Sequence, residues 1–171
     1  VRGEGGRSQR VREVGVLGGS AVREARRRRK AQREFRNLLE AGRDAMVSSD
    51  SVGDIALVNA QAVRMFGYQR EAMVGHKVEM LIPQRLRNAH AGHRDHYFTG
   101  PKVREMGAGL ELSGRRKDGS EFPIEISLSP LETDDGMFAT AAVRDITDRK
   151  LAERTLTEYA RTLEASNVQL E

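Results

Sequence analysis

The amino-acid sequence predicts an α+β fold in which an antiparallel sheet leads directly into a charged helix. The stretch 111–128 has Asp118-Gly119 at its centre, and Asp-Gly between two alternating runs is a strong hairpin signal. After this turn, apolar residues alternate with polar ones, as in a strand with one apolar face: Phe122, Ile124, Ile126 and Leu128. A second turn at 133–136 precedes a third strand at 137–143, whose small residues favour a central place in the sheet. The pattern then changes to that of a helix at 144–150.

Shorter elements precede this part of the chain. Two short strands are predicted at 45–50 and 55–59, and Asn59 is expected to cap a helix that Gly67 ends. The longest internal helix is predicted from 84 to 98, where a Gly-Pro pair follows it. The expected order is therefore two strands, a set of helices, and then the antiparallel strands that lead into the C-terminal helix.

Composition limits what the protein can be. A chain of 171 residues with 38% hydrophobic and 5% aromatic residues can bury one modest core. No apolar run is long enough to span a bilayer, and no signal-peptide pattern opens the chain. The absence of cysteine excludes disulfides and thiolate metal sites. These features together predict a cytoplasmic protein.

Positive charge is concentrated at the N-terminus. Residues 1–34 hold 11 of the 29 Lys and Arg and 4 of the 25 Asp and Glu, a local balance of +7 that leaves −3 for the rest. We expect a disordered basic leader at 1–20 and an amphipathic helix at 21–43. The run Arg26–Lys30 could contact nucleic acid or an anionic membrane surface, but it lacks interleaved aromatic residues. We therefore interpret it as a solvated helix and expect no nucleic-acid partner.

The C-terminal segment 148–171 carries a short heptad pattern. Leu156, Leu163 and Leu170 repeat every seven residues on an otherwise charged surface, which favours a two-stranded coiled coil over a single buried helix. Together with the helix at 21–43, this stripe predicts a parallel homodimer. The pattern also leads us to expect that the coiled coil continues towards an effector domain.

The chain resembles a bacterial PAS domain in two motifs, Arg-Arg-Lys-Asp-Gly-Ser-Glu-Phe-Pro-Ile-Glu-Ile at 115–126 and Asp-Ile-Thr-Asp-Arg-Lys at 145–150. Further similarity lies upstream, at 59–68, 75–77 and 81–83, so that the resemblance covers about residues 35–150. It implies a PAS core at 44–147, with a five-stranded antiparallel sheet in the order 2-1-5-4-3 and helices on one face. PAS domains are sensor and dimerisation modules, and the segment after the core most resembles the linkers of sensor histidine kinases, which implies a kinase as effector.

The resemblance also bears on chemistry. It implies signalling rather than catalysis, and the sequence shows no nucleophile paired with an oriented base, so we expect no enzyme activity in this segment. Light-sensing PAS domains with flavin-cysteinyl chemistry need a cysteine, and this chain has none.

The helix at 84–98 holds three histidines, His90, His93 and His96. Helical spacing places Leu86, His90, His93 and Tyr97 on one face, which we expect to be buried, with Arg94 towards solvent. The run 86–90 resembles heme-binding PAS oxygen sensors, and this resemblance implies that His90 is the axial ligand of the iron and that Leu110 and Tyr97 border the cofactor. Those sensors commonly carry an arginine where this chain has Leu110. The alternative is a packed histidine in a heme-free pocket, and a metal site built from all three histidines is weaker because three-residue steps spread them around the helix.

Signal output is predicted at the junction Asp145-Ile146-Thr147, because no turn residue separates the third strand from the helix. Asp145 can cap that helix or pair with an arginine such as Arg144 or Arg149. Two function classes remain open at this point: a sensory input module that responds to a ligand or cofactor, and a ligand-free structural dimerisation module.

Overall fold

The computed structural model describes residues 21–30, 33–34, 36–106 and 111–168. The chain divides into two compact units, 1–41 and 42–171. In the first, the described residues from 21 to 40 are helical. The leader expected at 1–20 lies outside the described residues.

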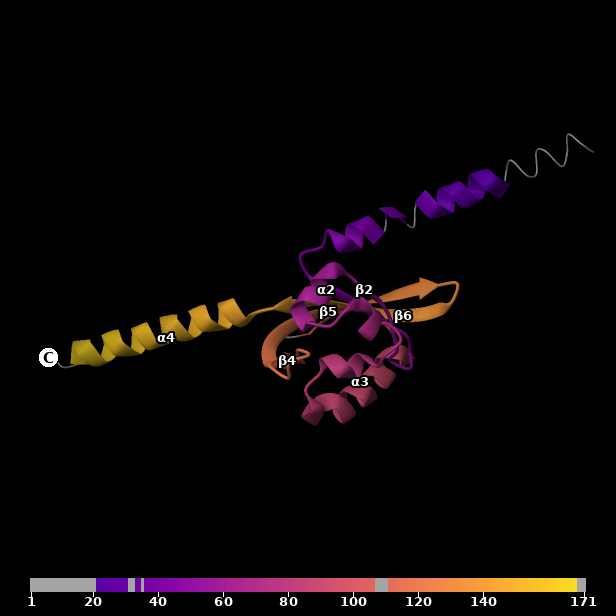
Figure 1. Cartoon of the computed structure of the whole chain (residues 1–171). Helices are drawn as coiled ribbons and strands as arrows, with labels where there is room; N and C mark the ends of the chain where they lie inside the picture. The colour runs from indigo at the N-terminus through magenta and orange to yellow at the C-terminus, as the bar shows by residue number, and fades with distance from the viewer. Residues whose placement is uncertain (1–20, 31–32, 35, 107–110, 169–171) are drawn as a thin grey trace, which may run out of the picture. The chain divides into compact units, whose positions relative to one another are not determined.

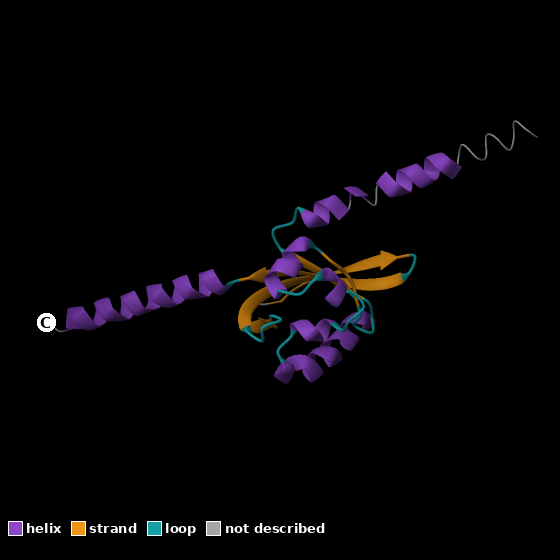
Figure 2. Cartoon of the chain, in the orientation of Figure 1, coloured by secondary structure: helices purple, strands orange, loops and turns teal. Residues whose placement is uncertain are grey.

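The second unit is built on one antiparallel sheet (Figure 2). Its strands are β1 (Ala45–Ser49), β2 (Ile55–Val58), β3 (Arg104–Met106), β4 (Leu112–Arg115), β5 (Glu121–Thr133) and β6 (Gly136–Asp145). They lie in the order β2-β1-β6-β5-β3, and β4 also pairs with β5. The α+β class, the antiparallel sheet and the central place of the strand after the second turn are therefore confirmed.

The strand expected before the Asp118-Gly119 turn is divided into two, β3 and β4. Met106 pairs with Ile126 and Leu112 pairs with Ile124, so five residues of this strand stand against one residue of β5. Four of those five, 107–110, are outside the described residues. Counted separately, β3 and β4 give a sheet of six strands where five were expected. Counted as one interrupted strand, they give the order 2-1-5-4-3 that the resemblance implied.

The helical elements are α2 (Ala60–Phe66), α3 (Arg87–Thr99), α4 (Thr147–Val168) and three short 3₁₀ turns, η1 (Arg70–Ala72), η2 (Val78–Leu81) and η3 (Gln84–Leu86) (Figure 1). The cap expected at Asn59 is confirmed, because its side chain accepts a hydrogen bond from the N–H of Ala62. Gly67 ends α2 with a φ of 77°, a left-handed conformation that glycine adopts without steric cost. None of the helices among the described residues is long and apolar enough to cross a membrane.

One face of the sheet forms the core. The apolar alternation of β5 is confirmed at Phe122 and Ile124, which are buried with residues of β1, β2, β6 and α2. Phe66 of α2 and Phe122 of β5 lie with their ring centroids 5.7 Å apart and tilted by 59°. Phe122 of β5 therefore packs α2 against the inner face of the sheet. The same strand contacts the start of the exit helix, through Pro123 and Glu125.

Candidate functional site

The carboxylate of Glu79, which is mostly shielded from solvent, contacts His90. The Nδ1 of His90 lies 3.1 Å from Oε1 of Glu79 in η2, and Arg94 donates a hydrogen bond to the same oxygen. The side chains of Glu79 and Arg94 are only 14% and 15% exposed, whereas that of His90 is 34% exposed. The structure thus places His90 in a charged cluster between η2 and α3.

The buried face of α3 differs from the expected one. Tyr97 is buried as predicted, and its hydroxyl donates to the carbonyl of Lys102 over 3.0 Å. Leu86 and His93 are exposed, however, and Arg94 faces inward. Leu86 belongs to the 3₁₀ turn η3, whose three residues per turn break the helical spacing on which the prediction relied.

The remaining residues expected near a cofactor are Tyr97 and Leu110, and His96 is the third histidine of the helix. Burial raises the pKa of the Tyr97 hydroxyl, which is consistent with its place in the protein interior. Leu110 lies outside the described residues, so its contacts stay a prediction. His96 is exposed on α3.

The junction between β6 and α4 is closed by hydrogen bonds on both sides. Ile146 is buried, and its N–H donates to the carbonyl of Pro123 in β5 over 3.1 Å. Its own carbonyl accepts the first helical hydrogen bond, from the N–H of Lys150. One oxygen of Asp145 accepts from both the N–H and the hydroxyl of Thr147, at 2.9 and 2.5 Å. Asp145 therefore satisfies an amide at the N-terminus of α4 that has no helical partner.

Arg116 connects this junction to the core. It donates to the second oxygen of Asp145 over 2.8 Å and to the carbonyl of Met65 in α2. Its guanidinium carbon lies 3.7 Å from the centre of the Phe122 ring, a cation–π contact. One side chain in the β4–β5 hairpin thus contacts α2, β5 and the residue that caps the exit helix.

The arginines suggested by the sequence are not the partners of Asp145. Arg144 forms a two-bond pair with Asp44, at 3.0 and 2.9 Å, and Arg149 pairs with Glu125. Capping and ion pairing were expected as alternatives, yet Asp145 does both at once because its two oxygens serve different donors.

The electrostatics of Asp145 follow from these contacts. Burial by itself raises its pKa, but the hydrogen bonds from the Thr147 hydroxyl and amide, followed by that from Arg116, outweigh it. The net effect holds the pKa of Asp145 below the ordinary value of an aspartate. The carboxylate is therefore stabilised in its charged form by the groups that it connects.

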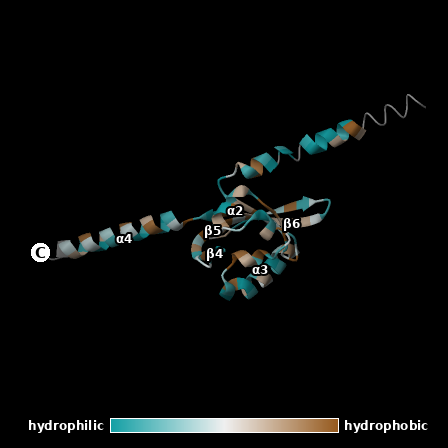
Figure 3. Cartoon of the chain, viewed as in Figure 1, coloured by the Kyte–Doolittle hydropathy of each residue, from teal (hydrophilic) through white to brown (hydrophobic). Residues whose placement is uncertain are grey.

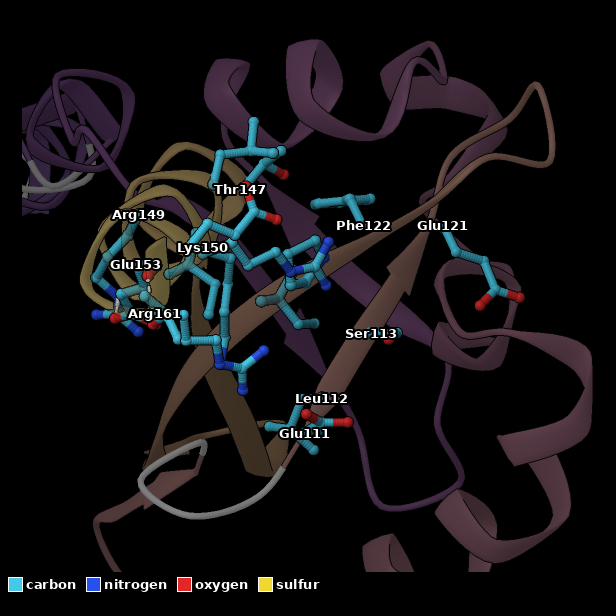
Figure 4. A pocket seen from close by; sticks show the side chains of 17 residues that line it. Glu111, Leu112, Ser113, Glu121, Phe122, Thr147, Arg149, Lys150, Glu153 and Arg161 are labelled. Carbon is cyan, nitrogen blue, oxygen red and sulfur yellow. Dashed lines mark hydrogen bonds and ion pairs between the residues drawn. The ribbon is translucent and has the colours of Figure 1, made fainter. Parts of the chain in front are cut away.

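A groove of about 680 Å³ lies beside the same junction, between the β4–β5 hairpin and α4 (Figure 4). Its apolar lining comes from both parts: Leu112, Phe122, Pro123, Ile124, Ile146 and Leu151. Charged side chains of both signs surround these residues, among them Arg149, Glu153, Arg154 and Arg161 of α4. No sequence pattern indicated this groove, because it forms only where two elements distant in sequence meet.

Sequence reasoning also missed Arg116 and Glu79. Arg116 stands in a motif that carried the family resemblance, which is the signal that could have marked it. Glu79 sits in a short 3₁₀ turn with no periodic pattern, and nothing in the sequence distinguishes it from an exposed acid.

Comparison with known proteins identifies the class. The family model of the PAS domain matches residues 43–148, more than half of the chain, and the chain belongs to this family. The PAS domain of an HTR-like protein from Haloarcula marismortui superposes with a TM-score of 0.59 at 21% identity, over 72% of this chain and 98% of that one. A PAS domain from a two-component sensor histidine kinase gives 0.55 at 20% identity, over 68% and 97%. These structures share the fold.

Curated relatives include signalling proteins. The chain is 29% identical to the sensor protein FixL of Bradyrhizobium diazoefficiens over 130 residues, which are 76% of this chain and 26% of FixL. It is 35% identical to the oxygen sensor protein DosP of Escherichia coli over 92 residues, 54% of this chain and 12% of DosP. It is 30% identical to the cell-division control histidine kinase PdhS of Brucella ovis over 140 residues, 81% and 13%. The chain spans about a quarter or less of these relatives, and it is a PAS sensory domain related to histidine kinases and to an oxygen sensor.

Proposed function

We propose that this PAS domain is the sensory input and dimerisation module of a bacterial signal-transduction protein, in which a histidine kinase is the effector. The observation that carries the proposal is the double role of Asp145, which binds Thr147 of α4 with one oxygen and Arg116 with the other. A change in the core that moves Arg116 therefore acts on the first turn of the exit helix without an intervening flexible segment.

The proposed output path has three contacts. Arg116 contacts α2 through the carbonyl of Met65 and β5 through the ring of Phe122, so a movement of either element displaces its guanidinium. Both Met65 and Phe122 belong to the hydrophobic core, so a ligand that alters core packing displaces them. Asp145 then either keeps both partners or loses one, which supplies the two arrangements that a switch requires.

Dimerisation is proposed through α4. Leu156, Tyr159 and Leu163 are 70%, 67% and 64% exposed, and apolar residues recur along this helix between hydrophilic ones (Figure 3). At 100° per residue the three lie within about 60° of one another around the helix axis, and roughly opposite Arg154 and Arg161, which line the groove. A stripe this narrow and exposed fits the seam of a two-stranded coiled coil.

Light scattering tests the dimer. The protein should be a dimer at micromolar concentration, and Leu156→Glu should shift it towards monomer. Leu151→Glu is the matched control, because Leu151 is 54% exposed on the same helix but lies off the stripe. A monomeric unmodified protein, or equal effects of the two variants, would refute dimerisation by this seam.

Kinase output tests the sensory role. In the full-length protein, Asp145→Ala should change autophosphorylation at saturating signal while the PAS domain stays folded by circular dichroism. Unchanged output with a slightly lower melting temperature would leave Asp145 as a structural cap and would overturn the proposed path.

A second candidate function is heme-based gas sensing with His90 as axial ligand. It is favoured by the similarity to a relative that is named an oxygen sensor and by the donor set around His90. An axial histidine needs one ring nitrogen held by a hydrogen bond and the other available for iron. Of the two ring nitrogens of His90, Nδ1 makes a hydrogen bond and Nε2 makes none with the described residues. Nε2 therefore fits the second requirement. Bound heme would supply the gas-binding iron, and this chain would supply the ligand and its orientation.

Absorbance separates these candidates. Reconstitution with hemin should produce a Soret band that His90→Ala abolishes and that His93→Ala, the matched control on the exposed side of α3, leaves intact. Equal loss in both variants would refute the His90 assignment. No band in the unmodified protein, and no bound molecule by native mass spectrometry, would favour a ligand-free dimerisation module.

A further inference from the structure

Two side chains of α3 converge on one carboxylate oxygen of η2. Oε1 of Glu79 in η2 accepts from Nδ1 of His90 and from a guanidinium nitrogen of Arg94. The side chains of Glu79 and Arg94 are mostly buried, and that of His90 is about one-third exposed. Arg94 also pairs with Asp95 over 3.2 Å, through its other terminal nitrogen. Its Nε is buried and has no hydrogen-bond partner among the described residues. The guanidinium is thus held at this position by its two terminal nitrogens alone.

The loop before β2 makes room for this arrangement. A Cβ atom built on Gly53 would lie 2.2 Å from Nη1 of Arg94, far inside any permitted contact. Gly53 also has a φ of 89°, which L-residues rarely adopt. The absence of a side chain at Gly53 therefore lets Arg94 reach Glu79, and Glu79 in turn reaches His90.

The chemistry of a carboxylate then fixes the proton of the imidazole. An ionised carboxylate can only accept hydrogen bonds, so the neutral His90 ring that faces it must carry its proton on Nδ1. The lone pair is then on Nε2, which makes no hydrogen bond within the described part of the chain. A histidine held in this tautomer by a carboxylate has the arrangement of a metal ligand whose partner orients the ring and strengthens it as a donor.

We propose that Glu79 is a positioning residue that presents His90, through Nε2, as an axial ligand to heme iron, and that Arg94 moderates the charge of Glu79. The identity of the iron rests on the second candidate function above, whereas the tautomer rests on the geometry alone. Arg94 shares the carboxylate, so it draws negative charge away from the oxygen that faces His90. Removing Glu79 should therefore weaken His90 as a ligand, and removing Arg94 should strengthen it.

The first test needs no cofactor and no variant. Long-range ¹H–¹⁵N correlation spectra of the metal-free protein at pH 8, where a free imidazole is neutral, should show His90 as the Nδ1–H tautomer. Glu79→Gln, which keeps the shape but removes the charge, should give a mixture that includes the Nε2–H form. Glu71→Gln is the matched control, an exposed acid in the neighbouring 3₁₀ turn η1. The Nε2–H tautomer in the unmodified protein, or no difference between the two variants, would overturn the proposal.

The second test uses hemin and resonance Raman spectroscopy. Glu79→Gln should weaken hemin binding about 10- to 100-fold, the usual loss when the partner of a ligating histidine is removed. It should also lower the iron–histidine stretching frequency, and Arg94→Met should raise it. A purely structural role of Glu79 would reduce the amount of folded protein without these opposite shifts.

The two proposals can fail separately. If the unmodified protein binds no hemin, heme sensing fails and His90 has no iron to bind, whereas the first test still decides whether Glu79 fixes the tautomer of His90. If hemin binds through His90 but Glu79→Gln changes neither affinity nor frequency, heme sensing stands and the positioning role of Glu79 is wrong.

Discussion

The contact between Arg116 and Asp145 can be measured with a double-mutant cycle. The pair is 2.8 Å long, and the two side chains are 31% and 29% exposed. An exposed pair is worth about 0–1 kcal/mol, and a hydrogen bond to a charged group about 1.5–3 kcal/mol. A pair with this partial burial should fall between these ranges, so we expect a coupling energy of about 1 kcal/mol.

The single variants should each cost more than the coupling. Asp145→Ala also removes the bonds from Thr147, and loss of a helix cap costs about 0.5–2 kcal/mol. Arg116→Met keeps an apolar side chain on Phe122 but loses the bond to the Met65 carbonyl. We therefore expect roughly 2 kcal/mol for each variant, and about 1 kcal/mol less than their sum for the double variant.

Urea unfolding followed by circular dichroism provides the assay, provided that the transition is two-state. The control cycle is Arg85 and Glu121, a pair at 2.7 Å whose side chains are 59% and 43% exposed, and its coupling should be smaller. Additivity of Arg116→Met and Asp145→Ala within about 0.3 kcal/mol would show that the two residues are not coupled, and the reasoning on the exit path would be wrong.

Three further predictions concern stability. Asn59→Ala should cost about 2–4 kcal/mol in urea unfolding, because Asn59 is buried, accepts from the amides of Ala62 and Met46 and donates to the carbonyl of Asp44. Gly53→Ala should lower the melting temperature, because a φ of 89° strains an L-residue and the new Cβ would displace the guanidinium of Arg94, whereas Gly92→Ala, which meets nothing within 4 Å on α3, should raise it or leave it unchanged. Because the pKa of Asp145 is lowered in the folded state, the unfolded state binds more protons at about pH 4. The contribution of Asp145 to the free energy of unfolding is therefore present above about pH 4 and is lost as pH falls through the folded pKa. Asp145→Asn should accordingly flatten the acid limb of a stability–pH curve, and an unchanged limb would contradict this assignment.

Local sequence signals predicted the parts of the fold that local physics determines. The Asp118-Gly119 hairpin, the alternation of Phe122 and Ile124 and the cap at Asn59 each depend on neighbours within a few residues, and all are present. The division between β3 and β4 was not predicted, because an interruption of a strand leaves no periodic pattern in the sequence.

The candidate site was harder to predict than the fold. Leu86 was expected on the buried face of α3 because regular helical spacing was assumed, and the 3₁₀ turn at 84–86 rotates it out of register. Glu79 and Arg116 are charged residues outside long regular elements, and a solvated surface is the ordinary expectation for both. Their roles depend on partners 11 to 51 residues away, which no short window of sequence relates to them.

The exit of β6 is held from both faces of the sheet, and this follows from the alternation of a strand. Successive residues point to opposite faces, so Arg144 and Asp145 reach different partners. Arg144 bonds Asp44, the residue before β1, whereas Asp145 bonds Arg116 on the other side. Asp44 is only four residues after residue 40, where the helical segment ends, so one end of β6 is tied both to the entry of the core and to its interior. A displacement of β6 must therefore carry both pairs with it or break one of them, and either outcome changes the direction in which α4 begins.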